Sequence, residues 1–196
     1  MKMAIPLRRR IIMMIGVLVL APTIGAGAWA LGLRLTGNIH IVAEGKVWRS
    51  AQLSPNSLKT MLSNHGIKTV INLRGSHPEE EWYRAERAAT DALGVQHISL
   101  PLSATIEPDD ETLQALVLMM QKVELPLLIH CEAGADRSGL ASALYRLIIE
   151  GDKPADASSQ LSFRFGHFPW GPSRTGAMDR AFWRVAAAPE KIKPKD

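Results

Sequence analysis

Hydrophobic and polar residues divide the chain into an uncharged N-terminal segment and a longer region of short, periodic apolar runs. Residues 11–33 carry no charged side chain. A helix of that length, rising about 1.5 Å per residue, crosses the ~30 Å hydrocarbon core of a bilayer. Pro22 kinks such a helix without preventing its insertion. The pattern therefore predicts one transmembrane helix over 11–33.

Basic residues precede this segment and predict its orientation. Several lie within residues 1–10, whereas Arg34 alone follows the segment closely. The positive-inside rule places residues 1–10 in the cytoplasm and the rest of the chain on the other side of the membrane. The basic residues concerned are Lys2, Arg8, Arg9 and Arg10.

A cleaved signal peptide is the alternative for the same segment. Ala28, Trp29 and Ala30 resemble a small-residue cleavage site that follows a basic leader. The apolar run over 11–33 exceeds the ~15 residues usual for a signal peptide, which favours an anchor that is not cleaved. Both alternatives place the rest of the chain outside the cytoplasm.

Residues 38–186 show alternating strand and helix patterns without a second shift in composition, and we interpret them as one domain. A helix is predicted between Ser54, an N-cap followed by Pro55, and Gly66. The alternation predicts an α/β fold with a central, mostly parallel sheet flanked by helices on both faces. The other predicted elements are strands at 68–74, 95–100 and 126–130, helices at 78–93, 108–123 and after Gly139, and a flexible tail at 187–196.

Composition and charge exclude several classes of protein. With 46% hydrophobic and 21% charged residues among 196, the chain suits one globular domain with a short appendage, and it does not suit a disordered protein. The net charge of +4 comes from the N-terminal cluster, after which 19 basic residues balance 19 acidic ones, so we expect no nucleic-acid partner. Cys131 is the single cysteine, and its thiol either packs in the core or is reactive.

The segment from His130 to Gly139 joins a predicted strand to a predicted helix. In such a loop, successive backbone N–H groups converge on an anion, and the start of the helix adds positive potential. Both effects favour the thiolate form of Cys131, which is then a nucleophile at neutral pH. Arg137 supplies a planar guanidinium that grips two phosphate oxygens. The spacing of these residues points to chemistry on a phosphoryl group.

Residues 130–138, in the form His-Cys-x-x-Gly-x-x-Arg-Ser, resemble the signature loop of the cysteine-dependent protein tyrosine and dual-specificity phosphatases. The stretches 47–54 and 66–74 look like the opening of the atypical dual-specificity branch, and 164–168 is similar to membrane-anchored bacterial members. The resemblance covers 38–186 and implies a phosphatase domain with a protein tyrosine phosphatase-like fold. It also implies a single-pass protein of a bacterial inner membrane with a periplasmic catalytic domain.

The resemblance implies a reaction that passes through a phosphocysteine intermediate and needs no metal or other cofactor. Cys131 attacks phosphorus, and Arg137 holds the phosphate oxygens. Ser138 hydrogen-bonds the sulfur, and His130 orders the loop. The substrate-binding residues that the resemblance implies are Glu132, Ala133, Gly134, Ala135 and Ser138.

The general acid is where the sequence departs from the family pattern. Most relatives place an aspartate roughly 30 residues before the cysteine, but position 99 is a serine. Asp109 and Asp110 are better explained, with Glu111, as acids that complement the start of a helix. Asp136 suits an ion pair with a neighbouring loop as well as it suits an acid role. We favour Asp136 narrowly because the catalytic turn fixes its place. The other candidates are Asp110, Asp109 and Glu107.

Hydrolysis of phosphomonoesters is the favoured function. The substrate is either a phosphorylated protein, cleaved at phosphotyrosine or with dual specificity, or a small phosphomonoester. Glu132 and Asp136 would repel a polyanionic lipid head group. The alternatives are a phosphatase for small-molecule or inositol phosphates and a non-catalytic phosphate-binding interaction module. The presence of both Cys131 and Arg137 argues against the non-catalytic module, and a thiol oxidoreductase lacks its second cysteine.

The histidines are weaker candidates for function. His167 either walls the pocket or, as we favour, packs in a turn on the core. The others show no ligand spacing, so a zinc site is not expected; they are His40, His65, His77 and His97.

Overall fold

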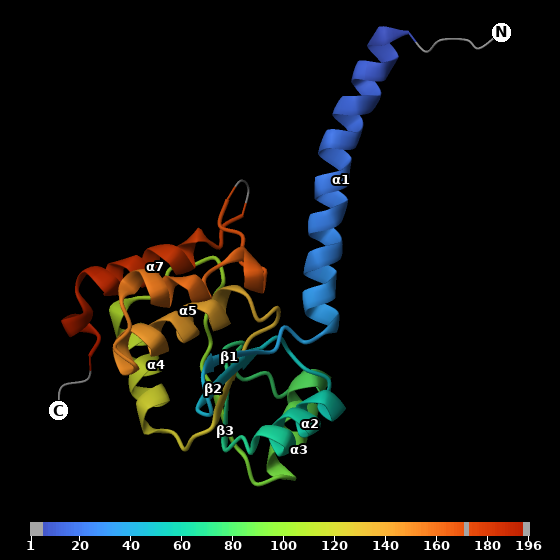
Figure 1. Cartoon of the computed structure of the whole chain (residues 1–196). Coiled ribbons are helices and arrows are strands. Elements are labelled where there is room, and N and C mark those ends of the chain that lie inside the picture. Colours follow the sequence, from blue (N-terminus) through green and yellow to red (C-terminus); the bar gives the residue numbers. More distant parts are fainter. Residues whose placement is uncertain (1–5, 171–172, 194–196) are drawn as a thin grey trace. The chain divides into compact units, whose positions relative to one another are not determined.

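The computed structural model describes residues 6–170 and 173–193 and divides into two compact units (Figure 1). The first unit is Met1–Thr36, and the second is Gly37–Asp196. The predicted basic segment 1–10 is therefore described only in part, and Lys2 lies outside the described residues.

The first unit is built on one long helix, α1 (Leu7–Leu35), which contains Pro22 and exposes most of its apolar side chains. Among the described residues, Met13–Leu35 is the one segment long and apolar enough to span a membrane by length and composition. The predicted helix over 11–33 is thus confirmed as a helix. A membrane anchor and an N-terminal signal sequence share these properties.

A five-stranded sheet forms the centre of the second unit, with the order β1-β2-β5-β3-β4. All described strand pairs are parallel except the edge pair of β1 with β2, which is antiparallel. This arrangement is the predicted mostly parallel sheet with an added edge hairpin that the sequence analysis did not identify. The strands are β1 (His40–Ala43), β2 (Val47–Ser50), β3 (Thr69–Asn72), β4 (Gln96–Ser99) and β5 (Leu127–His130).

Helices cover both faces of the sheet (Figure 1). On one face lie α2 (Pro55–His65) and α3 (Glu81–Asp91). On the other face lie α4 (Asp110–Lys122), α5 (Asp136–Leu144) and α7 (Gly176–Ala187). The short elements are η1 (Tyr145–Ile149), α6 (Pro154–Ala157), η2 (Ser158–Gln160), η3 (Phe163–Phe165) and η4 (Pro189–Lys191).

Alternate residues of the central strands enter two separate cores. In β3, Val70 packs towards α2 and α3, whereas its neighbour Ile71 packs towards α4, α5 and α7. In β5, Leu128 and Ile129 divide in the same way. Successive side chains of a strand point to opposite faces, so a strand covered on both sides must be apolar throughout. The continuous apolar run of 126–130 reflects this double burial.

Local sequence signals set the bounds of α2. The hydroxyl of Ser54 accepts a hydrogen bond from the backbone N–H of Ser57 at 3.2 Å, and Pro55 occupies the first turn. Gly66 ends the helix with a φ of 60°, a left-handed conformation that glycine adopts without a steric penalty. The predicted helix between Ser54 and Gly66 is confirmed.

The C-terminal segment differs from the flexible tail expected over 187–196. Residues Pro189–Lys191 form a 3₁₀ turn, and Ile192 packs into the larger core with 1% of its surface exposed. An apolar side chain within a charged segment is the physical reason, because burying it stabilises the turn that carries it. Residues 194–196 lie outside the described residues.

Candidate active site

The loop that carries Cys131 follows the central strand β5 and leads into α5, which begins at Asp136. β5 lies between β2 and β3, so the loop leaves the carboxyl end of the sheet with parallel strands on both sides. This edge is where open α/β sheets place their ligands. Cys131 is buried with 2% of its surface exposed.

Gly134 allows the loop to pack against the chain that follows β2. Its φ is 70°, and a Cβ atom there would lie 2.5 Å from the backbone nitrogen of Ala51 and 2.8 Å from the carbonyl oxygen of Ser50. Both neighbours are backbone atoms, which cannot rotate away. A side chain at position 134 would therefore push the loop off the sheet.

A buried arginine holds the back of the loop. The Nη2 group of Arg49 donates to the carbonyl oxygens of Gly134 at 2.8 Å and Ala135 at 2.9 Å, and Nη1 donates to that of Gln160 at 2.7 Å. Burial lowers the pKa of Arg49 to about 10, so the guanidinium stays charged at neutral pH. Charged donors make stronger hydrogen bonds than neutral ones, which suits a group that fixes a loop.

Two further donors bind the first half of the loop. The side-chain amide of Asn38 donates to the carbonyl oxygen of Ala133 at 3.0 Å and to that of Phe165 at 2.9 Å. The backbone N–H of Gln52 donates to the carbonyl oxygen of Glu132 at 3.1 Å. Asn38 and Gln52 both lie in segments next to the sheet, so the loop is fixed from the same scaffold that Arg49 belongs to.

The carbonyl oxygens of four successive residues, 132–135, are therefore all bound by donors of the scaffold. In a trans peptide, the C=O of one residue and the N–H of the next point in opposite directions. Holding these carbonyls against the scaffold turns the N–H groups of residues 133–136 to the other side of the loop. This is the arrangement of backbone donors that an anion-binding loop requires.

Arg137 lies at the start of α5 with 15% of its side chain exposed. Its Nη1 group reaches the carbonyl oxygens of Leu102 at 3.3 Å and Leu73 at 3.5 Å, and Nη2 lies 3.9 Å from Oε2 of Glu132. Its Nε–H is buried and has no hydrogen-bond partner among the described residues. The guanidinium is thus oriented by long contacts, and its buried Nε–H is available to a ligand.

Ser138 is fully buried, and its hydroxyl lies 3.5 Å from the carbonyl oxygen of Ser50. That distance is long for a hydroxyl hydrogen bond, whose donor and acceptor usually lie below about 3.0 Å apart. The described contacts place Ser138 on the scaffold side of the helix start. Its predicted contact with the sulfur of Cys131 stays a prediction.

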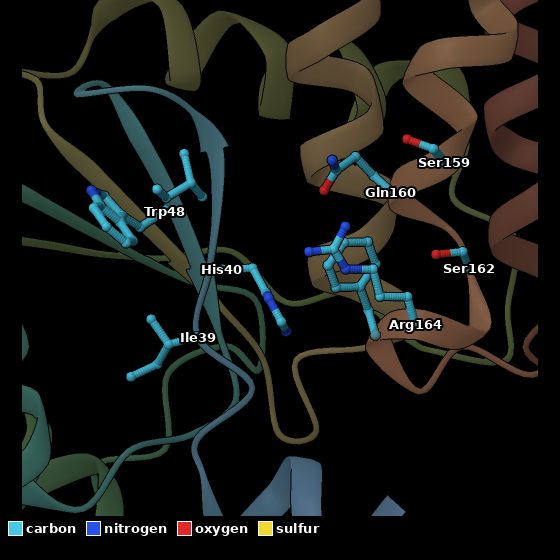
Figure 2. Close-up of a pocket in the computed structure, with 9 residues that line it drawn as sticks. Ile39, His40, Trp48, Ser159, Gln160, Ser162 and Arg164 are labelled. Carbon is cyan, nitrogen blue, oxygen red and sulfur yellow. The ribbon is translucent and has the colours of Figure 1, made fainter. Parts of the chain in front are cut away.

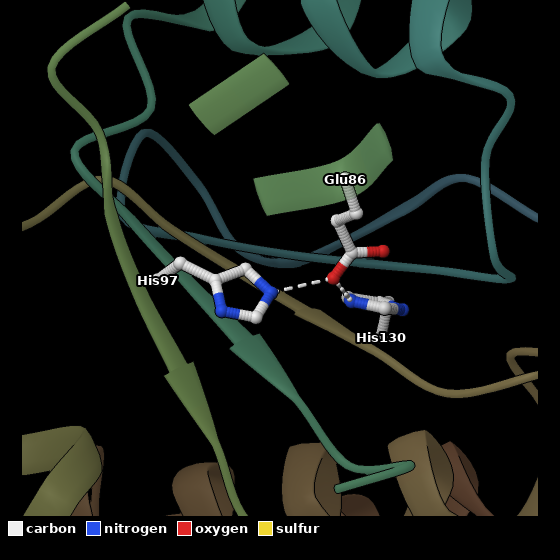
Figure 3. Close-up of side chains that lie close together, drawn as sticks. All are labelled: Glu86, His97 and His130. Atoms are coloured by element: carbon white, nitrogen blue, oxygen red, sulfur yellow. Dashed lines mark hydrogen bonds and ion pairs between the residues drawn. The ribbon is translucent and has the colours of Figure 1, made fainter. Parts of the chain in front are cut away.

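A buried carboxylate binds two histidines, one of which directly precedes the loop (Figure 3). Oε1 of Glu86 lies 2.7 Å from Nε2 of His97 and 2.9 Å from Nε2 of His130, the residue before Cys131. The side-chain amide of Gln52 also donates to Glu86. Burial raises the pKa of Glu86, but the charge and hydrogen bond of His130 with the bonds of His97 and Gln52 outweigh it and hold the pKa below its ordinary value.

Glu86, His97 and His130 offer three potential metal ligands within 4.8 Å of one another. Sequence reasoning missed this group because α3, β4 and β5 each contribute one residue, without a characteristic spacing. One signal was present, since Glu86 falls on the apolar face of its helix beside Ala89. Both imidazoles already bind the carboxylate, so hydrogen bonds account for the group.

A second buried group flanks the other end of the loop. His167 is fully buried, and its Nδ1 lies 2.7 Å from Oδ1 of Asp136 while its Nε2 lies 2.8 Å from Oδ2 of Asp179. Burial lowers the pKa of His167, but the hydrogen bonds and charges of Asp136 and Asp179 outweigh it, so the pKa lies above its ordinary value. His167 is buried, as the favoured packing on the core predicts, and Asp136 forms the ion pair that was the alternative to an acid role.

The remaining acid candidates are engaged at the start of α4. Asp109 caps this helix by accepting from the backbone N–H of Thr112 at 2.8 Å, as its place at a helix start predicts. Glu107 lies 2.9 Å from Nε of Arg184, and Asp110 forms an ion pair with the same arginine. All three carboxylates thus have partners in α4 or α7.

A pocket of about 510 Å³ lies beside the scaffold of the loop (Figure 2). Arg164, His40 and Trp48 line the pocket. Gln160 and Phe165 also line it, and their carbonyl oxygens accept hydrogen bonds from Arg49 and Asn38, respectively. Residues 131–138 do not line it. The pocket therefore borders the supports of the loop and not the face that its N–H groups occupy.

Comparison with known proteins places the fold in a known group. The family described as "DSP-PTPase phosphatase fused to NAD+ Kinase" matches residues 36–169. The dual specificity protein phosphatase TpbA of Pseudomonas aeruginosa (strain UCBPP-PA14) is 30% identical over 141 residues, which are 71% of this chain and 60% of TpbA. The chain thus spans 60% of the length of this curated relative.

Solved structures show the same fold. A cysteine-to-serine variant of P. aeruginosa TpbA in complex with pTyr superposes with a TM-score of 0.64 at 22% identity, covering 80% of this chain and 89% of that one. The PP-IP phosphatase SIW14 from S. cerevisiae superposes with a TM-score of 0.58 at 17% identity, covering 79% and 94%. These likenesses confirm the predicted α/β, protein tyrosine phosphatase-like fold.

Proposed function

Because the chain belongs to the DSP-PTPase phosphatase family, we propose that its second unit hydrolyses phosphomonoesters through a phosphocysteine intermediate. One observation carries the proposal: the carbonyl oxygens of residues 132–135 are all bound to the scaffold, which turns the N–H groups of 133–136 towards the other side. A dianionic phosphoryl group fits that set of donors beside the thiol of Cys131.

Cys131 and Arg137 carry the first step in this proposal. The thiolate attacks phosphorus, so that an S–P bond forms while the P–O bond to the leaving group breaks. Arg137 and the loop N–H groups hold the phosphoryl oxygens, and the buried Nε–H of Arg137, which has no partner among the described residues, would gain one. Water then attacks the S–P bond and releases inorganic phosphate and the thiolate. Ser138 assists departure of the sulfur.

Asp136 is the general acid in this proposal. Its side chain is 19% exposed at the first position of α5, next to Arg137. It would protonate the leaving oxygen as the P–O bond breaks. Asp109, Asp110 and Glu107 are the alternatives, although each has a partner at the start of α4.

We favour a phosphorylated protein, at tyrosine or with dual specificity, or a small phosphomonoester as substrate. Glu132 and Asp136 place two carboxylates in the loop, and Glu132 is exposed. Like charges disfavour a polyanionic head group more than a single phosphate. The structure of TpbA with pTyr supports an aryl phosphate for that relative.

Hydrolysis by the full chain in detergent, with a chelator present, tests this function. The wild type should hydrolyse p-nitrophenyl phosphate and members of a panel of phosphopeptides and phosphorylated metabolites. Arg137→Lys should be inactive, because a point charge does not replace the planar fork. A wild type that binds phosphate but turns over no substrate would instead indicate a non-catalytic phosphate-binding module.

We also propose that α1 anchors the chain in a bacterial inner membrane with the second unit in the periplasm. The support is its length and apolar composition and the basic residues before it. A reporter fused after Asp196 should be active only if it works in the periplasm. Mature protein that begins near Leu31 would show that the segment is cleaved, and a reporter active in the cytoplasm would overturn the orientation.

A further inference from the structure

His167 has no role in the mechanism given above, yet it is a fully buried ionisable group beside the loop. It is fully buried, and both ring nitrogens bind carboxylates, Asp136 from α5 at 2.7 Å and Asp179 from α7 at 2.8 Å. Two carboxylates facing one imidazole favour the doubly protonated ring, because each ring nitrogen then donates to a negative oxygen. A charged ring buried in this way is an available source of one proton.

We propose that His167 is a positioning residue that orients Asp136 and supplies the proton that Asp136 passes to the leaving group. This inference rests on the proposed phosphatase function and deepens it. Asp136 alone touches the substrate; His167 acts through it, and Asp179 holds His167 in its charged form.

The proton transfers balance over the two steps. As the S–P bond forms and the P–O bond breaks, the Nδ1 proton of His167 passes to the Asp136 carboxylate, which passes it on to the leaving oxygen. His167 is then neutral and still donates from Nε2 to Asp179. In the second step, water attacks the phosphocysteine, and its proton passes through Asp136 back to Nδ1 of His167. The alcohol and inorganic phosphate leave, and the site is restored.

Asp179 determines how long His167 stays charged as the pH rises. Burial on its own lowers the pKa of His167, whereas the two carboxylates raise it. Arg49, which binds the loop carbonyls, is another charged group that interacts with Asp136. Arg180, the residue after Asp179 on α7, pairs with Glu107 at 3.2 Å. Removing the charge of Asp179 should therefore make His167 lose its proton at lower pH.

The experiment measures kcat against pH for wild type and Asp179→Asn, with an alkyl phosphate and with p-nitrophenyl phosphate. For the alkyl phosphate, the basic limb should move to lower pH, and kcat at neutral pH should fall about 10-fold or more, with KM little changed. For p-nitrophenyl phosphate, whose leaving group needs little protonation, the loss should be at least several-fold smaller.

Two further variants keep the test decisive. Asp179→Glu retains the charge and should restore most of the alkyl-phosphate rate. Asp91→Asn, an exposed aspartate on α3, is the matched control and should alter neither profile. An unmoved basic limb in Asp179→Asn, or an equal loss on both substrates, would show that the group only clamps α5 to α7. That outcome leaves the phosphatase function intact, whereas hydrolysis by Cys131→Ser would overturn the function itself.

Discussion

Two buried groups of histidines and carboxylates flank the loop of Cys131, and their composition is opposite. Before the loop, one carboxylate, Glu86, binds two imidazoles, one of which belongs to His130 (Figure 3). After the loop, one imidazole, His167, binds two carboxylates, one of which belongs to Asp136. The central residue of each group, Glu86 or His167, determines which charge its neighbours stabilise.

In the Glu86 group, the carboxylate stays ionised and accepts hydrogen bonds from His97, His130 and Gln52. Such a group fixes the orientation of His130, the residue before Cys131. In the His167 group, both carboxylates raise the pKa of the imidazole and so favour its protonated form. The same kinds of residue therefore surround an ionised carboxylate at one end of the loop and favour a protonated imidazole at the other.

Removal of the thiol between the two groups should have the largest effect. Cys131→Ser should lower hydrolysis of an aryl phosphate by roughly 10⁴ or more, because a serine hydroxyl is a much weaker nucleophile than a cysteine thiolate. The protein should still fold, because the change is nearly isosteric. Steady-state assays and thermal unfolding in detergent measure the two properties, and substantial residual turnover would exclude a phosphocysteine intermediate.

Neutralising the acid should give the next largest loss and should depend on the leaving group. Asp136→Asn should lower kcat for an alkyl phosphate by about 10² to 10⁴, and much less for p-nitrophenyl phosphate. Asp110→Asn is the matched variant at the start of α4. If Asp110→Asn shows the selective loss and Asp136→Asn impairs both substrates equally, Asp136 shapes the loop and the acid lies at the helix start.

Removing the Glu86 carboxylate should lower the free energy of unfolding. It should also lower the rate of hydrolysis by the same factor for good and poor leaving groups. Glu86→Ala leaves His97 and His130 without their buried partner and should cost about 3 kcal/mol of the free energy of unfolding. The rates on alkyl and aryl phosphates should fall together, since His130 precedes Cys131. Glu81→Ala, exposed in the first turn of the same helix, is the control and should change stability by less than about 0.5 kcal/mol.

The smallest expected effect is on the pH dependence of stability, which should have opposite signs for the two groups. The pKa of Glu86 is depressed, so its contribution is present above about pH 4.5 and is lost as the pH falls through the folded pKa. The pKa of His167 is raised, so its contribution is present below about pH 6.5 and is lost as the pH rises through the folded pKa.

The measurement is thermal or denaturant unfolding of wild type, Glu86→Gln and Asp179→Asn at several pH values. From about pH 6 to 9, the deficit of Asp179→Asn should shrink by roughly 1 kcal/mol, the scale of one charged hydrogen bond. As the pH falls below about 4.5, the deficit of Glu86→Gln should instead shrink, because the wild type loses the contribution of the ionised Glu86. Parallel curves for the two variants would contradict the contrast between the groups.

Local signals explain what the sequence could predict. Ser54, Pro55 and Gly66 mark α2 through backbone chemistry that acts over a few residues, and the spacing of Cys131 and Arg137 identifies the loop. The mostly parallel sheet follows from the alternation of strands and helices. These features depend on neighbours in the chain, so they can be read before the fold is known.

The supports of the loop could not be predicted in the same way. Arg49 reaches the loop across 85 positions of sequence, and Asp179 meets His167 only because α7 packs on α5. Glu86 occupies an apolar face because two distant histidines satisfy it there. Each of these contacts forms only when the complete fold has packed, so no local sequence pattern predicts which residues will meet.

The single cysteine has a consequence for the response to oxidants. A peroxide that reaches a thiolate converts it to a sulfenic acid, which is normally rescued when a second thiol forms a disulfide with it. Cys131 has no such partner among the 196 residues of this chain. Recovery then depends on a thiol from another molecule or on ring closure with a neighbouring backbone nitrogen. Once oxidation passes to the sulfinic acid, the nucleophile is lost for the lifetime of the molecule.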